Sequence, residues 1–520
     1  MSFEKISNKL VDFFLIPLLV ISICGSISLL PTLLQLVPNK AILFFAGLLI
    51  LAYVGYSLLR VKEKFFRIPN KIKKLLLIIF ICITLIWQFM LVRALSGEFG
   101  WDPRSFIEYI YRIPSIINDD KIYFSLYPNN FMLLIIEKLF QVIFNIKTPN
   151  GLILGLNVLN IFIIDVSVFL LFLAISKLFS KRVAWFTTFL YWLLYMIWPF
   201  VVIPYSDNWS ILAGTLFLFI YSKNQNFKNL FLNFCFGTVT AFALLMKPST
   251  VIFIIAIVII KIFFSLQRKK KIKVRKLFKI IVSFGLGFII LYSPVKSYQQ
   301  HNHIANIESS RKMPLTHFIA MGMSGGGGYN ASDVTKNIEI RSPRKRNNYN
   351  IKLIRERLSK MGFGGYLKFL VQKQINNTAD GSLGWAHEGN YLYEPFEKHL
   401  NKIEKHIRSL FLNRDVNQEY LIADVNMNGY KFFPQIIWVV ALIFILFATI
   451  GDSHETLQLL KYTVVGGFMF LLLFEGGRSR YLIQFSPYLF TLAGLGIDKF
   501  ISRCVNTLYF RNLGVLQNSK

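Results

Sequence analysis

The chain has 520 residues, of which 54% are hydrophobic and 16% are charged, and its formal net charge is +31. Soluble domains carry about 25% charged residues, and here apolar runs recur from near the N-terminus to about residue 500, so composition excludes a single soluble core. Much of the basic excess lies in short connectors between apolar runs, where Lys and Arg resist translocation. The charge therefore indicates topology and no nucleic-acid partner.

Twelve apolar runs have about the length needed to cross the hydrocarbon core of a bilayer. They cover residues 11–31, 41–60, 75–95, 152–176, 183–203, 208–222, 229–246, 250–265, 277–294, 432–450, 460–475 and 481–499. The first run is too long for a signal peptide and has no small-residue cleavage site, so we interpret it as a retained helix. The predicted fold class is an all-α polytopic membrane protein with about 12 transmembrane helices.

The run Phe131–Ile146 decides the topology. Five basic segments fall on one side only if this run does not cross the membrane; they are Arg60–Lys74, Lys177–Arg182, Lys223–Lys228, Arg268–Lys279 and the tail after Lys499. The Glu137–Lys138 pair would also be unfavourable at mid-bilayer. We therefore expect an interfacial helix at Phe131–Ile146, with both termini in the cytoplasm.

This topology divides the chain into five segments. They are two N-terminal spans with a basic loop (1–74), a transmembrane core with an outer loop at 96–151 (75–295), a mixed extracytoplasmic domain (296–431), three C-terminal spans (432–500) and a basic cytoplasmic tail (501–520). The outer domain contains the Gly-rich stretch Gly322–Tyr329, which lacks the features of a phosphate loop and is predicted to be a flexible loop. An amphipathic helix is expected at Ile351–Gln374.

Two aspartates lie in connectors that the predicted topology places on the outer side of the membrane. Asp102 lies in Gly100–Arg104, and Asp207 lies in Pro204–Asn208. Each has a purely structural interpretation as a helix cap, because Asp followed by Pro is a common helix start and Asp207 directly precedes a span. A capping Asp can also act as a base, so the two interpretations are compatible.

Three cations also lie at predicted outer ends of spans, where short loops usually avoid Lys and Arg. Arg478 and Arg480 are either interface anchors or binding groups for an anion, because guanidinium groups match phosphate oxygens. Lys247 departs from the charge bias in the same way. His301 and His303 are two residues apart without a carboxylate partner, so no metal site is implied.

Several of these segments carry a resemblance through their order. An outer loop with Asp102 is followed by Tyr127-Pro-Asn-Asn130, by a second outer loop with Asp207, and by Arg478-Ser-Arg-Tyr481 at a late span edge. This order, from residue 74 to residue 500, resembles the GT-C glycosyltransferases, in particular the protein mannosyltransferase-like and aminoarabinose transferase-like membrane enzymes of bacteria, in their Gram-positive type. Two spans precede the usual first one. The first loop has Trp101-Asp102-Pro103 where the mannosyltransferases have adjacent Asp and Glu.

The resemblance implies a cell-membrane enzyme that moves a sugar, with inversion, from a polyprenyl-phosphate donor to an extracytoplasmic acceptor such as a cell-wall polymer or a surface protein. Asp102 would be the base, and Asp207 would orient the acceptor or the base. The other candidates would bind substrate, with the cations at the lipid phosphate; they are Arg478, Arg480, Tyr481, Lys247, Tyr127, Asn129 and Asn130. A divalent metal is compatible with such a site but is not required, and no cofactor is predicted.

Two other functions stay open. A transporter or flippase of lipid-linked sugars would show repeats, broken helices and charges at mid-span, whereas the chain shows no repeat and few charges in its apolar runs. A surface polysaccharide polymerase or ligase would rely on Arg and His of the large outer loop. The basic stretch Arg341–Lys360 suits an anionic polymer or is a solvated face.

Overall fold

The computed structural model describes residues 3–35, 69–98, 102–113, 122–267, 274–384, 396, 399–411, 431–451 and 454–517, the last thirteen as backbone alone. The helices among these residues are joined by turns and loops, and no β-strand occurs within them. The expected span 41–60, Trp101 and residues 412–430 lie outside the described residues.

In the described part of the chain, seven helices are long and apolar enough to cross a membrane. They are α1 (Phe3–Gln35), α4 (Asn70–Leu95), α8 (Pro149–Leu178), α12 (Ile252–Gln267, preceded by the 3-10 turn η5, Pro248–Val251), α13 (Val274–His301), α18 (Phe432–Thr449) and α19 (Glu455–Leu473). Three more helices pack among them: α10 (Ser206–Lys223), α11 (Leu230–Met246) and α20 (Ser486–Gln517).

The expected count of twelve spans is not confirmed. The run 183–203 is divided into α9 (Lys181–Tyr191), the π turn η3 (Trp192–Met196) and the 3-10 turn η4 (Pro199–Val202). Proline lacks a backbone N–H and cannot continue a helix regularly, which accounts for the break at Pro199. The run 481–499 likewise begins in the 3-10 segment η7 (Ser479–Phe485) before α20 starts.

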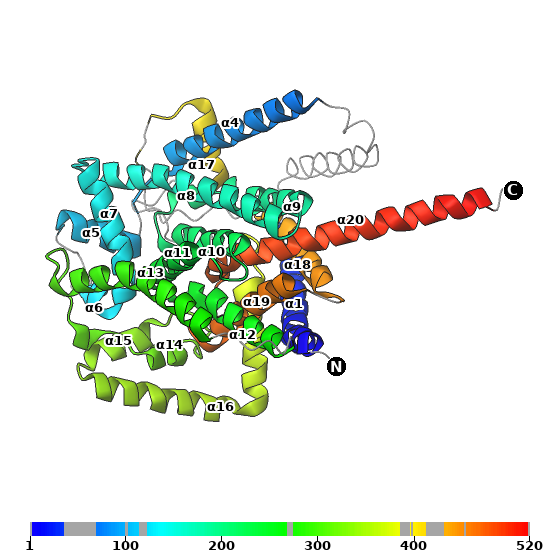
Figure 1. Cartoon of the computed structure of the whole chain (residues 1–520). Helices are drawn as coiled ribbons and strands as arrows, with labels where there is room; N and C mark the ends of the chain where they lie inside the picture. The colour runs from blue at the N-terminus through cyan, green and yellow to red at the C-terminus, as the bar shows by residue number, and fades with distance from the viewer. Residues whose placement is uncertain are drawn as a thin grey trace.

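A second group of helices, all of them short except α16 with its 36 residues, lies at one end of the bundle (Figure 1). It comprises α5 (Asp102–Tyr111), α6 (Tyr123–Leu126), η2 (Pro128–Asn130), α7 (Phe131–Ile143), η6 (Ser309–Arg311), α14 (Leu315–Met321), α15 (Ala331–Glu339), α16 (Pro343–Thr378) and α17 (Lys402–Phe411). The mixed domain expected at 296–431 is therefore helical where it is described. Its apolar residues recur at helical spacing, as Val334 and Ile338 do in α15.

The placement of α7 agrees with the expected non-crossing helix, which stays a prediction. α4 and α8 run antiparallel, because Asn157 Nδ2 donates to Ser96 Oγ (2.9 Å) while Gln88 Nε2 donates to Asp165 Oδ1 (3.0 Å). The chain thus leaves α4 and enters α8 at the same end of the bundle. α7 itself has 13 residues, about 20 Å of helix, which is too short to cross a hydrocarbon core of about 30 Å.

Segments that were predicted to be cytoplasmic meet at the opposite end. Arg182 pairs there with Asp498, and Lys261 pairs with Glu455. Asn8 donates to the carbonyl oxygen of residue 451. The structure thus separates the basic connectors from the shorter helices, as the predicted topology requires; which end faces the cytoplasm stays a prediction.

Arg346 holds together the segment that contains η6, α15 and the start of α16. Its guanidinium is 1% exposed and donates to backbone oxygens that include those of Asn337 (2.9 Å), Ile340 (2.8 Å) and Arg311 (2.9 Å). A buried guanidinium is stable only when its donors are satisfied. One side chain therefore fixes the ends of η6, α15 and α16 relative to one another.

Candidate active site

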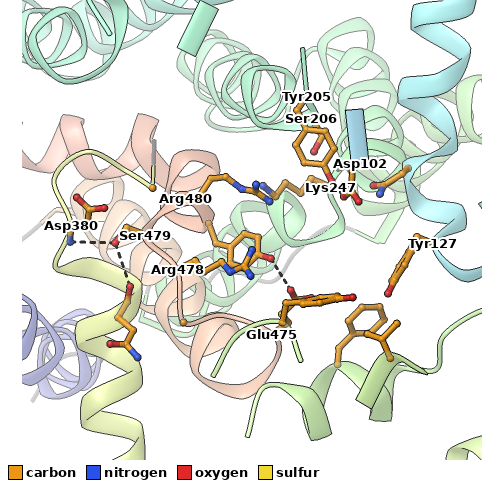
Figure 2. Close-up of a pocket in the computed structure, with 18 of the residues that line it drawn as sticks. Asp102, Tyr127, Tyr205, Ser206, Lys247, Asp380, Glu475, Arg478, Ser479 and Arg480 are labelled. Atoms are coloured by element: carbon orange, nitrogen blue, oxygen red, sulfur yellow. Dashed lines mark hydrogen bonds between the residues drawn. The ribbon is translucent and has the colours of Figure 1, made fainter. Parts of the chain in front are cut away.

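One cavity of about 1300 Å³ lies where the short helices meet the end of the bundle (Figure 2). Its wall is assembled from segments that are far apart in sequence, from α1 through α5, η2 and α16 to the connector after α19. It includes eight of the nine predicted site residues: Asp102, Tyr127, Asn129, Asn130, Lys247, Arg478, Arg480 and Tyr481. The motifs that were singled out in sequence thus converge on one place.

Asp102 is the first residue of α5, so it lies in the first turn of this helix and not at the N-cap position that the sequence suggested, and its carboxylate faces other polar groups. The Tyr205 hydroxyl donates to Asp102 Oδ2 at 2.6 Å, and the Tyr123 hydroxyl is also hydrogen-bonded to this carboxylate. Asn130 Nδ2 in turn donates to the Tyr123 hydroxyl at 2.5 Å. Burial raises the pKa of the Asp102 carboxyl above its ordinary value, while the Tyr205 hydrogen bond and the Arg480 charge offset part of that rise.

The cations come from two short connectors. Arg478 and Arg480 lie just before and within η7, and Lys247 lies between α11 and η5. The Arg480 guanidinium is 5.5 Å from the ring centroids of both Tyr205 and Tyr481, and Lys247 Nζ is 5.6 Å from that of Tyr481. Such cation–π contacts orient the cations without neutralising them. Arg480 is 6% exposed, so an interface anchor is the wrong description for it.

Asp207 lies behind the cavity wall and not on it. It forms an ion pair with Lys247, and its Oδ2 is 3.6 Å from Arg480 Nε. Tyr205 is the N-cap residue of α10 and forms no side-chain cap hydrogen bond. Asp207 lies in the first turn of this helix, where a negative charge is favourable, and its carboxylate contacts the two cations. This position favours fixing Lys247 and Arg480 over the expected contact with an acceptor.

Sequence reasoning missed the acid Glu475, which lies three residues before Arg478. Glu475 lines the cavity, and the Tyr481 hydroxyl donates to its Oε1 at 2.8 Å (Figure 2). Burial raises the pKa of the Glu475 carboxyl, and the Tyr481 hydrogen bond and the Arg478 charge lower it in part. The cavity therefore holds a second acid whose protonation depends on its surroundings.

The segment from α14 to α16 supplies another part of the wall, and the sequence did not indicate that this segment reaches the site. Phe318, Tyr329, Gln372 and Asn376 line the cavity from α14, the Gly-rich loop and α16. They lie on inward faces of elements whose packing partners are distant in sequence. Periodicity identifies such a face but not what it meets.

The Gly-rich stretch is a loop, as predicted, and it is tied to the arginine connector. Gly325 and Gly327 have φ of +51° and +90°, a region that favours glycine. The Gly327 carbonyl accepts from the backbone N–H of Gly476 (2.8 Å), and the Gly326 carbonyl accepts from Asn376 Nδ2 (3.0 Å). The loop thereby packs beside the segment that carries Arg478.

Lys373 joins three elements at this point. Its Nζ donates to the backbone oxygens of Gly322 (2.5 Å), Leu472 (3.0 Å) and Phe474 (2.7 Å). Burial lowers the pKa of the Lys373 ammonium to about 8. The three carbonyls match the three donors of an ammonium group, so this side chain fixes α16, the Gly-rich loop and the end of α19 together.

Within the described residues, no three His, Cys, Asp or Glu side chains are grouped so that they could hold a metal ion. The described cavity wall also contains no histidine. His317 is instead buried within α14, where burial lowers the pKa of its imidazole to about 4. The polar groups of the described cavity wall include carboxylates, cations, tyrosines and amides.

Helices of membrane-spanning length, with a cavity lined by charged residues at one end of the bundle, define a polytopic membrane protein. The model of one family, described as "Conserved hypothetical integral membrane protein", matches residues 14–501, and the chain belongs to this family. No curated protein matches the chain significantly.

Among solved structures, the chain is similar to the oligosaccharyltransferase of Archaeoglobus fulgidus. For the apo form the TM-score is 0.41 at 14% identity, over 83% of this chain and 52% of that one. For AglB from the same organism, in complex with an inhibitory peptide and a dolichol-phosphate, the values are 0.39, 12%, 83% and 51%. The chain spans about half the length of these proteins. TM-scores this low establish no common fold, so the functional argument rests on the cavity.

Proposed function

We propose that this protein is an integral membrane glycosyltransferase that moves a sugar from a polyprenyl-phosphate donor to an extracytoplasmic acceptor. The observation that carries the proposal is the cavity of about 1300 Å³, which places the buried acid Asp102 in one wall with Arg478, Arg480 and Lys247. It lies at the bundle end that is opposite the basic connectors. A site for a lipid phosphate is expected at this boundary between membrane and solvent.

The cations suit the leaving group of such a reaction. As the acceptor oxygen attacks the anomeric carbon, the bond from that carbon to the phosphate oxygen breaks and its electron pair stays on the lipid phosphate. Fixed positive charge at that oxygen stabilises the transition state. Arg478 and Arg480 would supply it, and Asp207 would hold Arg480 and Lys247 in place.

Asp102 would accept the proton of the acceptor hydroxyl. A carboxylate with a raised pKa is the stronger base, because catalytic efficiency increases as the pKa approaches the working pH. The Tyr205 and Tyr123 hydroxyls fix its orientation. Asp102 is thus both the start of α5 and the proposed base.

The remaining wall fits a sugar. Tyr127, Tyr329, Asn129 and Gln372 combine aromatic faces with amide donors and acceptors, the groups that bind the apolar faces and hydroxyls of a polar ring. We propose a cell-wall polymer or a surface protein as the acceptor. The absence of histidine from the described wall favours this enzyme over a polymerase or ligase that uses outer-domain His.

Replacing Asp102 with Asn tests the proposal. In membranes supplied with a polyprenyl-phosphate-linked sugar, Asp102→Asn should lower transfer by about 10²–10⁴-fold, the usual contribution of a general base. Glu108→Gln is the matched control, because Glu108 lies on the same helix, pairs with Arg104 and does not line the cavity. Transfer at the unaltered rate in Asp102→Asn would show that Asp102 only starts a helix. A flippase would instead move the donor across the membrane without consuming it.

A further inference from the structure

The second half of α16 exposes an apolar stripe. Phe363, Leu367 and Val371 recur every fourth residue and are 83%, 47% and 44% exposed. This spacing places them on one face of the helix. Lys373, on the other side of the helix, is fully buried. Gln374, three residues beyond Val371, is also fully buried, where the helix packs against α1. A monomeric soluble surface rarely presents such a stripe without a partner.

The same helix packs at membrane depth. Gln374 Nε2 and Thr378 Oγ1 donate to Ser22 Oγ of α1, at 3.1 and 2.8 Å. Ser22 lies 14 residues (22 − 8) beyond Asn8, which contacts the loop at residue 451 at the opposite end of the bundle. At about 1.5 Å per residue this is roughly 21 Å, less than the hydrocarbon thickness of about 30 Å.

A contact with α19 places the helix at a similar depth. Lys373 Nζ donates to the carbonyl of Leu472, and α19 begins at Glu455 at the opposite end of the bundle. Those 17 residues (472 − 455) correspond to about 26 Å. Both contacts place the C-terminal part of α16 within the leaflet at the cavity end.

Charge and backbone geometry agree with this depth. Lys360 and Lys368 are exposed beside the stripe, and residues 358–378 contain no acidic side chain. Lysines next to an apolar stripe match the phosphate level of a bilayer. Gly362, with φ of +62°, bends α16 sharply, so that its more polar first half runs in a different direction (Figure 1).

We infer that residues 363–378 form an interfacial helix whose stripe of Phe363, Leu367 and Val371 contacts acyl chains of the leaflet at the cavity end. Lys360 and Lys368 lie at its lipid phosphates. This inference goes beyond the proposed function and does not depend on it.

The position has a consequence for the cavity. Gln372 and Asn376 of the same helix line the cavity, so a single helix separates it from lipid. Lys373 ties that helix to the end of α19. Contact with the leaflet therefore fixes the depth of α16 relative to the segment that carries Arg478 and Arg480.

Site-specific photo-cross-linking of the full-length chain tests the inference. Phe363, Leu367 or Val371 is replaced by benzoylphenylalanine in nanodiscs of phosphatidylcholine and phosphatidylglycerol, and lipid adducts are measured by mass spectrometry after illumination. Phe162 on α8, which is 56% exposed, is the lipid-facing reference. Lys352 on the first half of α16, with a side chain that is 78% exposed, is the solvent-facing control.

The expected result is a lipid adduct at all three stripe positions at the level of Phe162→benzoylphenylalanine, and at least about tenfold above Lys352→benzoylphenylalanine. Adduct yields equal to those at Lys352 would overturn the inference. Adducts to a second copy of the chain would also overturn it, by assigning the stripe to a protein interface. With Lys360→Gln and Lys368→Gln, the phosphatidylglycerol share of the adducts at Phe363 should fall; an unchanged share would refute the headgroup contact.

Discussion

Asp207 is the residue whose replacement tests the architecture of the cavity most directly. It is 5% exposed, pairs with Lys247 and lies 3.6 Å from Arg480. Asp207→Asn keeps the size of the side chain and removes its negative charge. Both cations then keep their positions close to each other without the Asp207 charge between them.

The burial of the three side chains sets the magnitude. Counted for the side chains alone, the exposed fractions are 7% for Asp207, 14% for Lys247 and 8% for Arg480. Removing one member of a buried ion pair costs about 3–5 kcal/mol. We expect about 3 kcal/mol of lost unfolding free energy, at the low end because Lys247 borders the cavity. Adding Lys247→Met removes one excess charge, so the double variant should recover about 1–3 kcal/mol relative to the sum of the single costs.

Unfolding free energies from SDS titration in mixed micelles, followed by tryptophan fluorescence, measure both values. Glu339→Gln is the matched control, because the Lys336–Glu339 pair is 55% exposed on both side chains and such pairs contribute about 0–1 kcal/mol. If Asp207→Asn costs no more than Glu339→Gln, or if the double variant is additive, Asp207 does not hold the cations and the assigned role is wrong.

Three further outcomes are expected. Transfer needs ionised Asp102, so the rate of transfer should fall as the pH drops through the raised pKa of this carboxyl. Tyr205→Phe removes a hydrogen bond to the ionised carboxylate and should move that fall in rate to higher pH. An unchanged pH profile in Tyr205→Phe would assign the fall to another group. Lys373→Met deprives three carbonyls of their donor and should lower the unfolding free energy by about 1–3 kcal/mol in the same SDS titration. Lys368→Met, on the exposed face, should change it by no more than about 0.5 kcal/mol. Equal losses would show that Lys373 does not fix α16 to the end of α19. Thr148→Cys should react with an impermeant maleimide from outside intact cells and Ser180→Cys only after permeabilisation, and reversed labelling would put the cavity in the cytoplasm.

Membrane residence could be predicted from sequence, and the antiparallel packing of α4 and α8 agrees with the non-crossing helix predicted between them. The length of an apolar run and the position of Lys and Arg are local properties, and they decide whether a segment enters the bilayer and in which orientation. The breaks inside 183–203 and 481–499 were missed, because a long apolar run stays compatible with a π or 3-10 turn that packing stabilises.

Eight candidate residues line the cavity. Five of them lie in short polar segments near the ends of spans, where a polar group at membrane depth is conspicuous against an apolar background. The other three, Tyr127, Asn129 and Asn130, directly precede the interfacial helix α7. The sequence did not indicate which of the candidate residues face the cavity and which support its wall. Asp102 and Asp207 have the same sequence context, an acid in the first turn of a helix, yet one faces the cavity and the other lies behind its cations. Only the packing of α10 against the connector that carries Arg480 distinguishes them, since burial and distance to a partner are properties of the folded chain. The same packing assigns Tyr205 to Asp102 and Lys373 to the end of α19, contacts between residues that lie 103 and 101 positions apart.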